Sequence, residues 1–167
     1  MSGWRIGYIV ARKELIQQLM AVQDGTLCSP SVIGQHAALY ALEHETLISS
    51  QINKVKDSFA LTCKLLQPLI DQQIFSYSKP QAGIFLFLKT SYPDSEVLVQ
   101  ELLSHAKVGL TPGKDFGIHA DTAAYVRLCF ARTRPVIEQG IARLLDYFKV
   151  RNKIVGRGRG NLYNQGN

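Results

Sequence analysis

Hydrophobic residues in the first half of the chain recur at helical spacing. They return every three or four positions between Lys13 and Val22, between Val32 and Glu43, and again through the fifties and sixties, which predicts three helices with one apolar face each. The pair Asp24-Gly25 is expected to end the first helix, and Pro68 lies near the end of the third.

The second half of the chain alternates strand-like and helix-like segments. Apolar and β-branched runs predict strands at 74–77, 82–88, 108–111 and 125–131. Helical spacing returns at 95–107 and from Thr133 to about Val150, with Pro135 in the first turn. The run at residues 4–11 also fits a buried strand or the approach to one. This order predicts an α/β or α+β-like fold, with a small sheet of three or four strands covered by helices.

Past Val150 the apolar periodicity stops, and VGRGRGNLYNQGN predicts a flexible tail. The formal net charge is +6, from 19 basic and 13 acidic residues. Four of the basic residues and none of the acidic ones lie after Val150, so the rest of the chain is close to neutral.

Composition narrows the class of protein. Hydrophobic residues make up 46% and charged residues 19%, which favours a packed core over disorder. No apolar run approaches the roughly 20 residues of a membrane-spanning helix, and no signal-peptide layout is visible. We therefore expect a soluble, cytoplasmic protein. The three cysteines form no CxxC and the histidines have no metal spacing, so neither a disulfide scaffold nor a metal site is expected.

Two arginines lie in apolar, strand-like surroundings. Arg5 lies within Gly3–Gly7, and Arg127 lies within Tyr125–Phe130. Each can be a solvated side chain on an edge strand, because a charge is rarely buried without a partner. Each can also be an anion receptor, since a guanidinium in a dry cleft binds a carboxylate or phosphate through two parallel hydrogen bonds. The residues alone leave both readings open.

The segment Thr111–Gly117 contains Pro112 and Gly113, which allow a tight turn and a close backbone approach. It matches neither the phosphate-cradling P-loop nor the GxGxxG pattern. Taken alone, it is a loop between two strands.

Four segments together resemble a known family. MSGWRIGYIVA, PQAGIFLFL, LTPGKDFG and YVRLCFAR occur with the order and spacing seen in the C-terminal part of class I/II aminotransferases, the fold-type I pyridoxal-phosphate enzymes. The resemblance covers residues 1 to about 149. It implies the C-terminal part of a PLP-dependent transferase fold, with 1–45 as a remnant of the large cofactor domain and the interdomain helix. Residues 46–150 would form the C-terminal small domain, and 151–167 a flexible basic tail.

The resemblance also implies roles for individual residues. Arg5 would bind the phosphate of pyridoxal 5'-phosphate, and Arg127 would bind the substrate α-carboxylate. Pro80–Phe85 would supply a strand of the small domain, and Pro112–Gly117 would lead toward the substrate. Cys28–Gln35 corresponds to a region near the interface of the homodimer.

One part of the family's site has no counterpart in this sequence. The Schiff-base lysine lies a few residues upstream of the G-W-R-x-G arginine, a position that would precede Met1. No lysine of the chain matches it: Lys13 and Lys114 lie near matched segments but at other positions. The sequence thus predicts no catalytic residue within the chain, and an inactive chain when it is alone.

Three functions follow from these patterns. The first is an aminotransferase, moving an amino group between an amino acid and a 2-oxo acid, present as a C-terminal fragment. The alternative is a non-catalytic truncated product acting as a dimerisation or interaction module. The third is nucleic-acid binding by Arg157-Gly158-Arg159-Gly160. So few phosphate contacts give weak binding, so nucleic acid is not expected as a partner.

Overall fold

The computed structural model describes residues 2–117 and 120–160. The chain forms two compact units, residues 1–53 and 54–167, and the long helix α3 (Glu45–Asp71) contributes to both. The domain boundaries inferred from the family resemblance remain predictions. No helix in the described part of the chain is long and apolar enough to cross a membrane.

The N-terminal unit is helical. A short 3-10 helix (Ser2–Trp4) is followed by an irregular segment, by α1 (Lys13–Thr26) and by α2 (Val32–Glu43). Of the two readings of 4–11, the buried strand is wrong: this segment has no strand pairing, and Val10 is 86% exposed. A strand needs a neighbour for its backbone hydrogen bonds, and every strand among the described residues lies in the other unit.

The helices of this unit lie close to their predicted positions. α2 has the predicted bounds, and the Ser31 side chain caps it by accepting a hydrogen bond from the Gly34 amide at 3.3 Å. α1 runs through Asp24-Gly25 and ends one residue later. There the hydroxyl of Thr26 donates to the Val22 carbonyl at 2.9 Å, and Leu27 is the C-cap.

The C-terminal unit is built on a four-stranded antiparallel sheet. Its strands are β1 (Phe75–Ser76), β2 (Phe85–Thr90), β3 (Thr111–Pro112) and β4 (Tyr125–Cys129), in the order β1-β2-β4-β3. β2 and β4 form the centre, with Phe87 opposite Arg127. The predicted fold class, a small sheet covered by helices, is confirmed.

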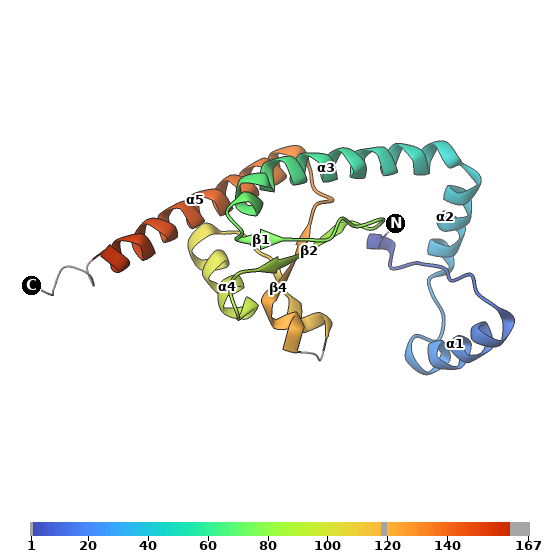
Figure 1. Cartoon of the computed structure of the whole chain (residues 1–167). Helices are drawn as coiled ribbons and strands as arrows, with labels where there is room; N and C mark the ends of the chain where they lie inside the picture. The colour runs from blue at the N-terminus through green and yellow to red at the C-terminus, as the bar shows by residue number, and fades with distance from the viewer. Residues whose placement is uncertain (1, 118–119, 161–167) are drawn as a thin grey trace, which may run out of the picture. The chain divides into compact units, whose positions relative to one another are not determined.

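Helices cover one face of this sheet. Figure 1 shows the C-terminal half of α3 and the helix α5 (Arg134–Gly160) together on one side of it. The helix α4 (Ser95–Glu101) contributes the buried Leu98 to the same core. The inward residues Leu86, Leu88 and Val126 are fully buried, in one core with Leu66 of α3 and Phe148 of α5.

Two helix ends differ from the prediction. The helix expected at 95–107 is α-helical only to Glu101 and continues as a π-helical turn over Leu102–Ala106, in which Leu103 is exposed. α5 continues past residue 150 to Gly160 instead of giving way to a flexible tail there. Residues 161–167, the rest of the predicted tail, lie outside the described residues.

Candidate functional site: an arginine among aromatic rings

The face of the sheet opposite the core carries the second set of strand side chains. Because side chains alternate along a strand, the residues of β2 that alternate with the buried Leu86 and Leu88 point to this face. Phe85 and Phe87 are each 38% exposed here, beside the half-buried Tyr125 and Arg127 of β4. The ring of Phe87 stacks on that of Tyr125, with centroids 4.8 Å apart. This face therefore combines a cation with an aromatic surface.

Arg127 is held by three neighbours. Its guanidinium carbon lies 4.2 Å from the ring centre of Phe85 and 4.6 Å from that of Phe116. Its Nη2 atom donates a hydrogen bond to the Thr111 hydroxyl at 3.3 Å. A cation is attracted to the electron-rich face of an aromatic ring, and the ring shields that side of the cation from water. The guanidinium is thus oriented, and further N–H groups are left for a ligand.

The loop after β3 forms a 3-10 helix over Gly113–Phe116 and brings Phe116 to this position. A Cβ atom on Gly113 would lie 2.3 Å from the Thr122 carbonyl oxygen, so the backbone can approach this closely only at a glycine. Lys114 forms an ion pair with Glu96 of α4. The rings of Phe116 and Phe87 meet edge to face, with centroids 6.2 Å apart. The loop is therefore fixed at its beginning and anchored to a helix.

Arg5 lies in the other unit, in a different setting from the one expected. It occupies a turn directly after the 3-10 helix, with a φ of 52°, and its side chain is exposed. The strand-like surroundings predicted for Arg5 are therefore wrong, whereas those predicted for Arg127 are confirmed by its place on β4.

The aromatic neighbours of Arg127 had no predicted role. Phe85 and Phe116 occur in the quoted segments, but neither spacing nor composition links residues 31 positions apart in sequence. The signal available was the alternation Phe85-Leu86-Phe87-Leu88, which places two aromatic rings on one face of a strand.

A second cluster of charged residues joins α4 to α5. The Tyr147 hydroxyl donates to the Glu101 carboxylate at 2.6 Å, and Arg151 forms an ion pair with the same carboxylate. The guanidinium carbon of Arg151 also lies 4.6 Å from the ring centre of Tyr92. The Tyr147 hydrogen bond lowers the pKa of Glu101, and Arg151 lowers it further. These groups are bound to one another, and their arrangement indicates a structural role.

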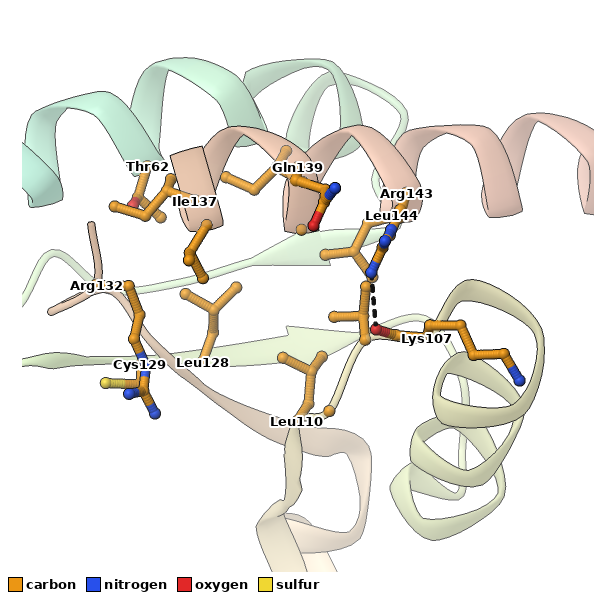
Figure 2. A pocket seen from close by; sticks show the side chains of 15 residues that line it. Thr62, Lys107, Leu110, Leu128, Cys129, Arg132, Ile137, Gln139, Arg143 and Leu144 are labelled. Carbon is orange, nitrogen blue, oxygen red and sulfur yellow. Dashed lines mark hydrogen bonds between the residues drawn. The ribbon is translucent and has the colours of Figure 1, made fainter. Parts of the chain in front are cut away.

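A cavity of about 240 Å³ lies elsewhere in the same unit, between α5, the segment 107–110 and β4 (Figure 2). Arg127 and its aromatic neighbours do not line it. The cavity is therefore separate from the arginine site.

Known proteins similar to this chain are aminotransferases. The (5-formylfuran-3-yl)methyl phosphate transaminase of Methanocaldococcus jannaschii is 29% identical over 147 residues, which cover 88% of this chain and 38% of that protein. The aspartate aminotransferase of Thermotoga maritima is 26% identical, over 90% of this chain and 37% of that protein. The chain spans less than two fifths of the length of either relative.

Solved structures give the same result. A crystal structure from Methanococcus jannaschii, described as similar in its active site to kynurenine aminotransferases, superposes with a TM-score of 0.70 at 28% identity. The superposition covers 88% of this chain and 38% of the chain in that crystal structure. The aspartate aminotransferase of Thermotoga maritima superposes with a TM-score of 0.68 at 25% identity. The sequence pattern of the class I and II aminotransferases matches residues 1–144, and the chain therefore belongs to that family.

Proposed function

We propose that this chain is the substrate-carboxylate-binding part of a pyridoxal-phosphate-dependent aminotransferase, which transfers an amino group between an amino acid and a 2-oxo acid. The observation that carries the proposal is the setting of Arg127. Its guanidinium is oriented by Thr111 and lies over two phenylalanine rings, on the face of the sheet opposite the core.

Arg127 is suited to fix the orientation of the substrate. A guanidinium binds a carboxylate through two parallel hydrogen bonds, so it sets both the position and the plane of the carboxylate. The rings of Phe85 and Phe116 keep water from part of the cation, and electrostatic attraction is stronger where water is excluded. When Arg127 holds the carboxylate, the substrate α-carbon is held in one place. This raises the rate of the chemical step, because the substrate is already oriented when the reaction begins.

Arg5 is the residue of this chain proposed for the cofactor phosphate. Its side chain is exposed, and a guanidinium has the charge and the paired donors that a phosphate requires. Bound pyridoxal phosphate would supply an electron sink for the carbanion formed at the substrate α-carbon. The protein's part at Arg5 is to anchor the cofactor and balance its charge.

The lysines nearest to the matched segments do not suit the covalent step. Lys114 is paired with Glu96, and the hydrogen bond that its ammonium group donates to that carboxylate raises the pKa of Lys114. A nucleophilic lysine needs the opposite shift, toward the neutral amine. Lys13 lies exposed at the start of α1. We propose that the Schiff-base lysine is supplied from outside residues 1–167.

The remaining assignments are proposals of the same kind. Residues 1–45 would belong to the cofactor domain and the interdomain helix, residues 46–150 to the small domain, and 151–167 to an added basic tail. In the proposed cytoplasmic homodimer, the segment 28–35 would lie near the partner. The exposure of Val32 and Ile33, at 64% and 72%, supports a contact surface there.

Pyruvate binding to the full chain tests the role of Arg127. In an NMR titration, pyruvate is expected to shift the Arg127 side-chain N–H signals, whereas its uncharged methyl ester is not. Arg127→Gln should weaken pyruvate binding at least about tenfold, and Arg127→Lys should have an intermediate effect because it keeps the charge but loses the paired donors.

Arg134→Gln is the matched control, because Arg134 is an exposed arginine already paired with Glu138. It should leave the affinity for pyruvate unchanged. Unaltered pyruvate binding by Arg127→Gln would contradict the proposed function.

A further inference from the structure

The guanidinium of Arg127 lies toward one end of its sheet face. Its carbon atom is 4.2 Å from the ring centre of Phe85. Phe85 pairs with Cys129, which follows Arg127 by two residues on β4, whereas Lys89 and Tyr125 pair at the other end. The alternating burial of β2 and β4 places these side chains together on the face opposite the core. A group beside Cys129 is therefore near the Arg127 guanidinium, and Lys89 is at the end away from it.

Arg132 brings a second guanidinium to the Cys129 end. Its amide donates to the Phe130 carbonyl at 2.8 Å, and its carbonyl accepts from the Ser58 hydroxyl at 3.2 Å, so its backbone is fixed shortly after β4. In Figure 2 the Arg132 side chain runs away from the helices, and its guanidinium lies beside Cys129. Both residues also line the edge of the same cavity. Arg132 therefore reaches the sheet face that carries Arg127.

The two guanidiniums flank one cross-strand pair of residues. Side chains directly opposite each other on antiparallel strands have Cβ atoms ~4.5–5.5 Å apart. The Arg127 guanidinium lies over the Phe85 ring of this pair, and the Arg132 guanidinium lies beside Cys129. We therefore expect the two cations to lie within about 10 Å of each other, with the Phe85 ring between them.

Arg132 is available to a ligand. Its side chain is exposed, and among the residues that the structure describes no carboxylate lies within ion-pair distance of it or of Arg127. Arg134, two residues later, is in contrast paired with Glu138. Two neighbouring cations repel each other, and an anion that contacts both of them removes this repulsion. The pair of arginines therefore favours a ligand with two negative charges.

We propose that Arg132 binds the second carboxylate of a dicarboxylic substrate whose α-carboxylate is bound by Arg127. The inference rests on the function proposed above and names its substrate class, the four- and five-carbon dicarboxylic 2-oxo acids and the corresponding amino acids. The carboxylate carbons of an extended five-carbon chain are roughly 5 Å apart. With a hydrogen bond of about 3 Å at each end, such a ligand spans the distance between the two guanidiniums. Its methylene groups lie against the Phe85 ring.

2-Oxoglutarate is the probe, and 2-oxopentanoate is its counterpart with the same chain length and no second carboxylate. In NMR titrations of the full chain, both acids should shift the side-chain N–H signals of Arg127, whereas only 2-oxoglutarate should shift those of Arg132. We expect the dissociation constant of 2-oxoglutarate to be about fivefold lower, a modest preference because an exposed ion pair contributes little. Equal dissociation constants for the two acids would overturn the proposal.

Two substitutions on the same sheet face locate the second carboxylate. Arg132→Gln should reduce the preference for 2-oxoglutarate to less than twofold and leave the affinity for 2-oxopentanoate unchanged. Lys89→Gln is the matched control, because Lys89 is an exposed cation at the end of this face away from Phe85. It should keep the full preference. Loss of the preference in Lys89→Gln but not in Arg132→Gln would show that the second carboxylate is bound elsewhere.

Arg127→Gln distinguishes failure of this inference from failure of the proposed function. If 2-oxopentanoate binding depends on Arg127 but the preference for 2-oxoglutarate does not depend on Arg132, only the assignment of Arg132 is wrong. If Arg127→Gln leaves the binding of both acids unaltered, the function proposed for Arg127 is wrong, and the role of Arg132 in binding its substrate is wrong with it.

Discussion

A single glycine controls the loop that brings Phe116 to Arg127. Gly113→Ala would place a Cβ 2.3 Å from a backbone carbonyl oxygen and 2.7 Å from the Cβ of Tyr125. Neither atom belongs to a flexible side-chain end, so the loop or β4 must shift. We expect a loss of about 1–3 kcal/mol in the free energy of unfolding, measured by urea denaturation, as for other overpacked sites.

Gly109→Ala is the control, since its Cβ would meet nothing within 4 Å. It should change stability by no more than about 0.5 kcal/mol, as surface substitutions usually do. Equal stability of Gly113→Ala and Gly109→Ala would show that the loop tolerates movement at Gly113, against the tight packing described above.

At the level of residues, the sequence indicates which side chains could bind a ligand but not which residues those side chains contact. The position of Arg127 in an apolar strand followed from alternation in the sequence, because strand periodicity is a local property. Its contacts with Phe116 and Thr111 depend on where a loop and an edge strand lie after folding. No local pattern encodes such distances. Arg5 shows the reverse error: an apolar neighbourhood suggested a strand where the structure has a turn.

The attachment of α5 to α4 depends on a carboxylate, and this makes it sensitive to acid. The Tyr147 hydrogen bond and the Arg151 ion pair lower the pKa of Glu101 below its ordinary value of 4.5. A group with a lowered folded-state pKa stabilises the protein above its unfolded-state pKa, and this contribution is lost as the pH falls through the folded-state pKa.

Glu101→Gln should therefore lower the free energy of unfolding by about 1 kcal/mol at pH 7, a value reduced from that of a buried charged hydrogen bond because the site is partly exposed. The difference from the wild type should shrink as the pH falls below 4.5. Urea denaturation at a series of pH values measures it. Glu138→Gln, at an exposed pair on α5, should cost only a few tenths of a kcal/mol. A Glu101→Gln effect that stays constant down to pH 2 would show that the carboxylate charge is not its cause.

At the level of elements, helices were easier to predict than strands. α2 has its predicted bounds because a capping serine and a local apolar period define both of its ends. The predicted strand at 74–77 shortens to β1 (Phe75–Ser76), because strand length depends on the partner strand. The extension of α5 to Gly160 could not be read from the sequence, since the apolar period ends ten residues earlier.

For the whole molecule, the prediction concerns the cofactor. In the described structure Arg127 is oriented by Thr111 and by two phenylalanine rings, Arg5 is exposed, and Lys114 is held in an ion pair. If Arg5 anchors the cofactor as proposed, and no lysine of the chain occupies the family's Schiff-base position, the cofactor should bind without a covalent bond. Added pyridoxal phosphate is therefore expected to give no stoichiometric visible absorption band of a Schiff base. Borohydride reduction is expected to attach no stoichiometric cofactor to the protein.

Arg5→Gln should weaken any reversible binding of the cofactor, measured by equilibrium dialysis. Arg12→Gln changes an exposed arginine in the same unit and should leave the binding unchanged. A stoichiometric, borohydride-trapped adduct on one lysine would show that the chain carries its own Schiff-base residue, and mass spectrometry of the labelled peptide would identify it.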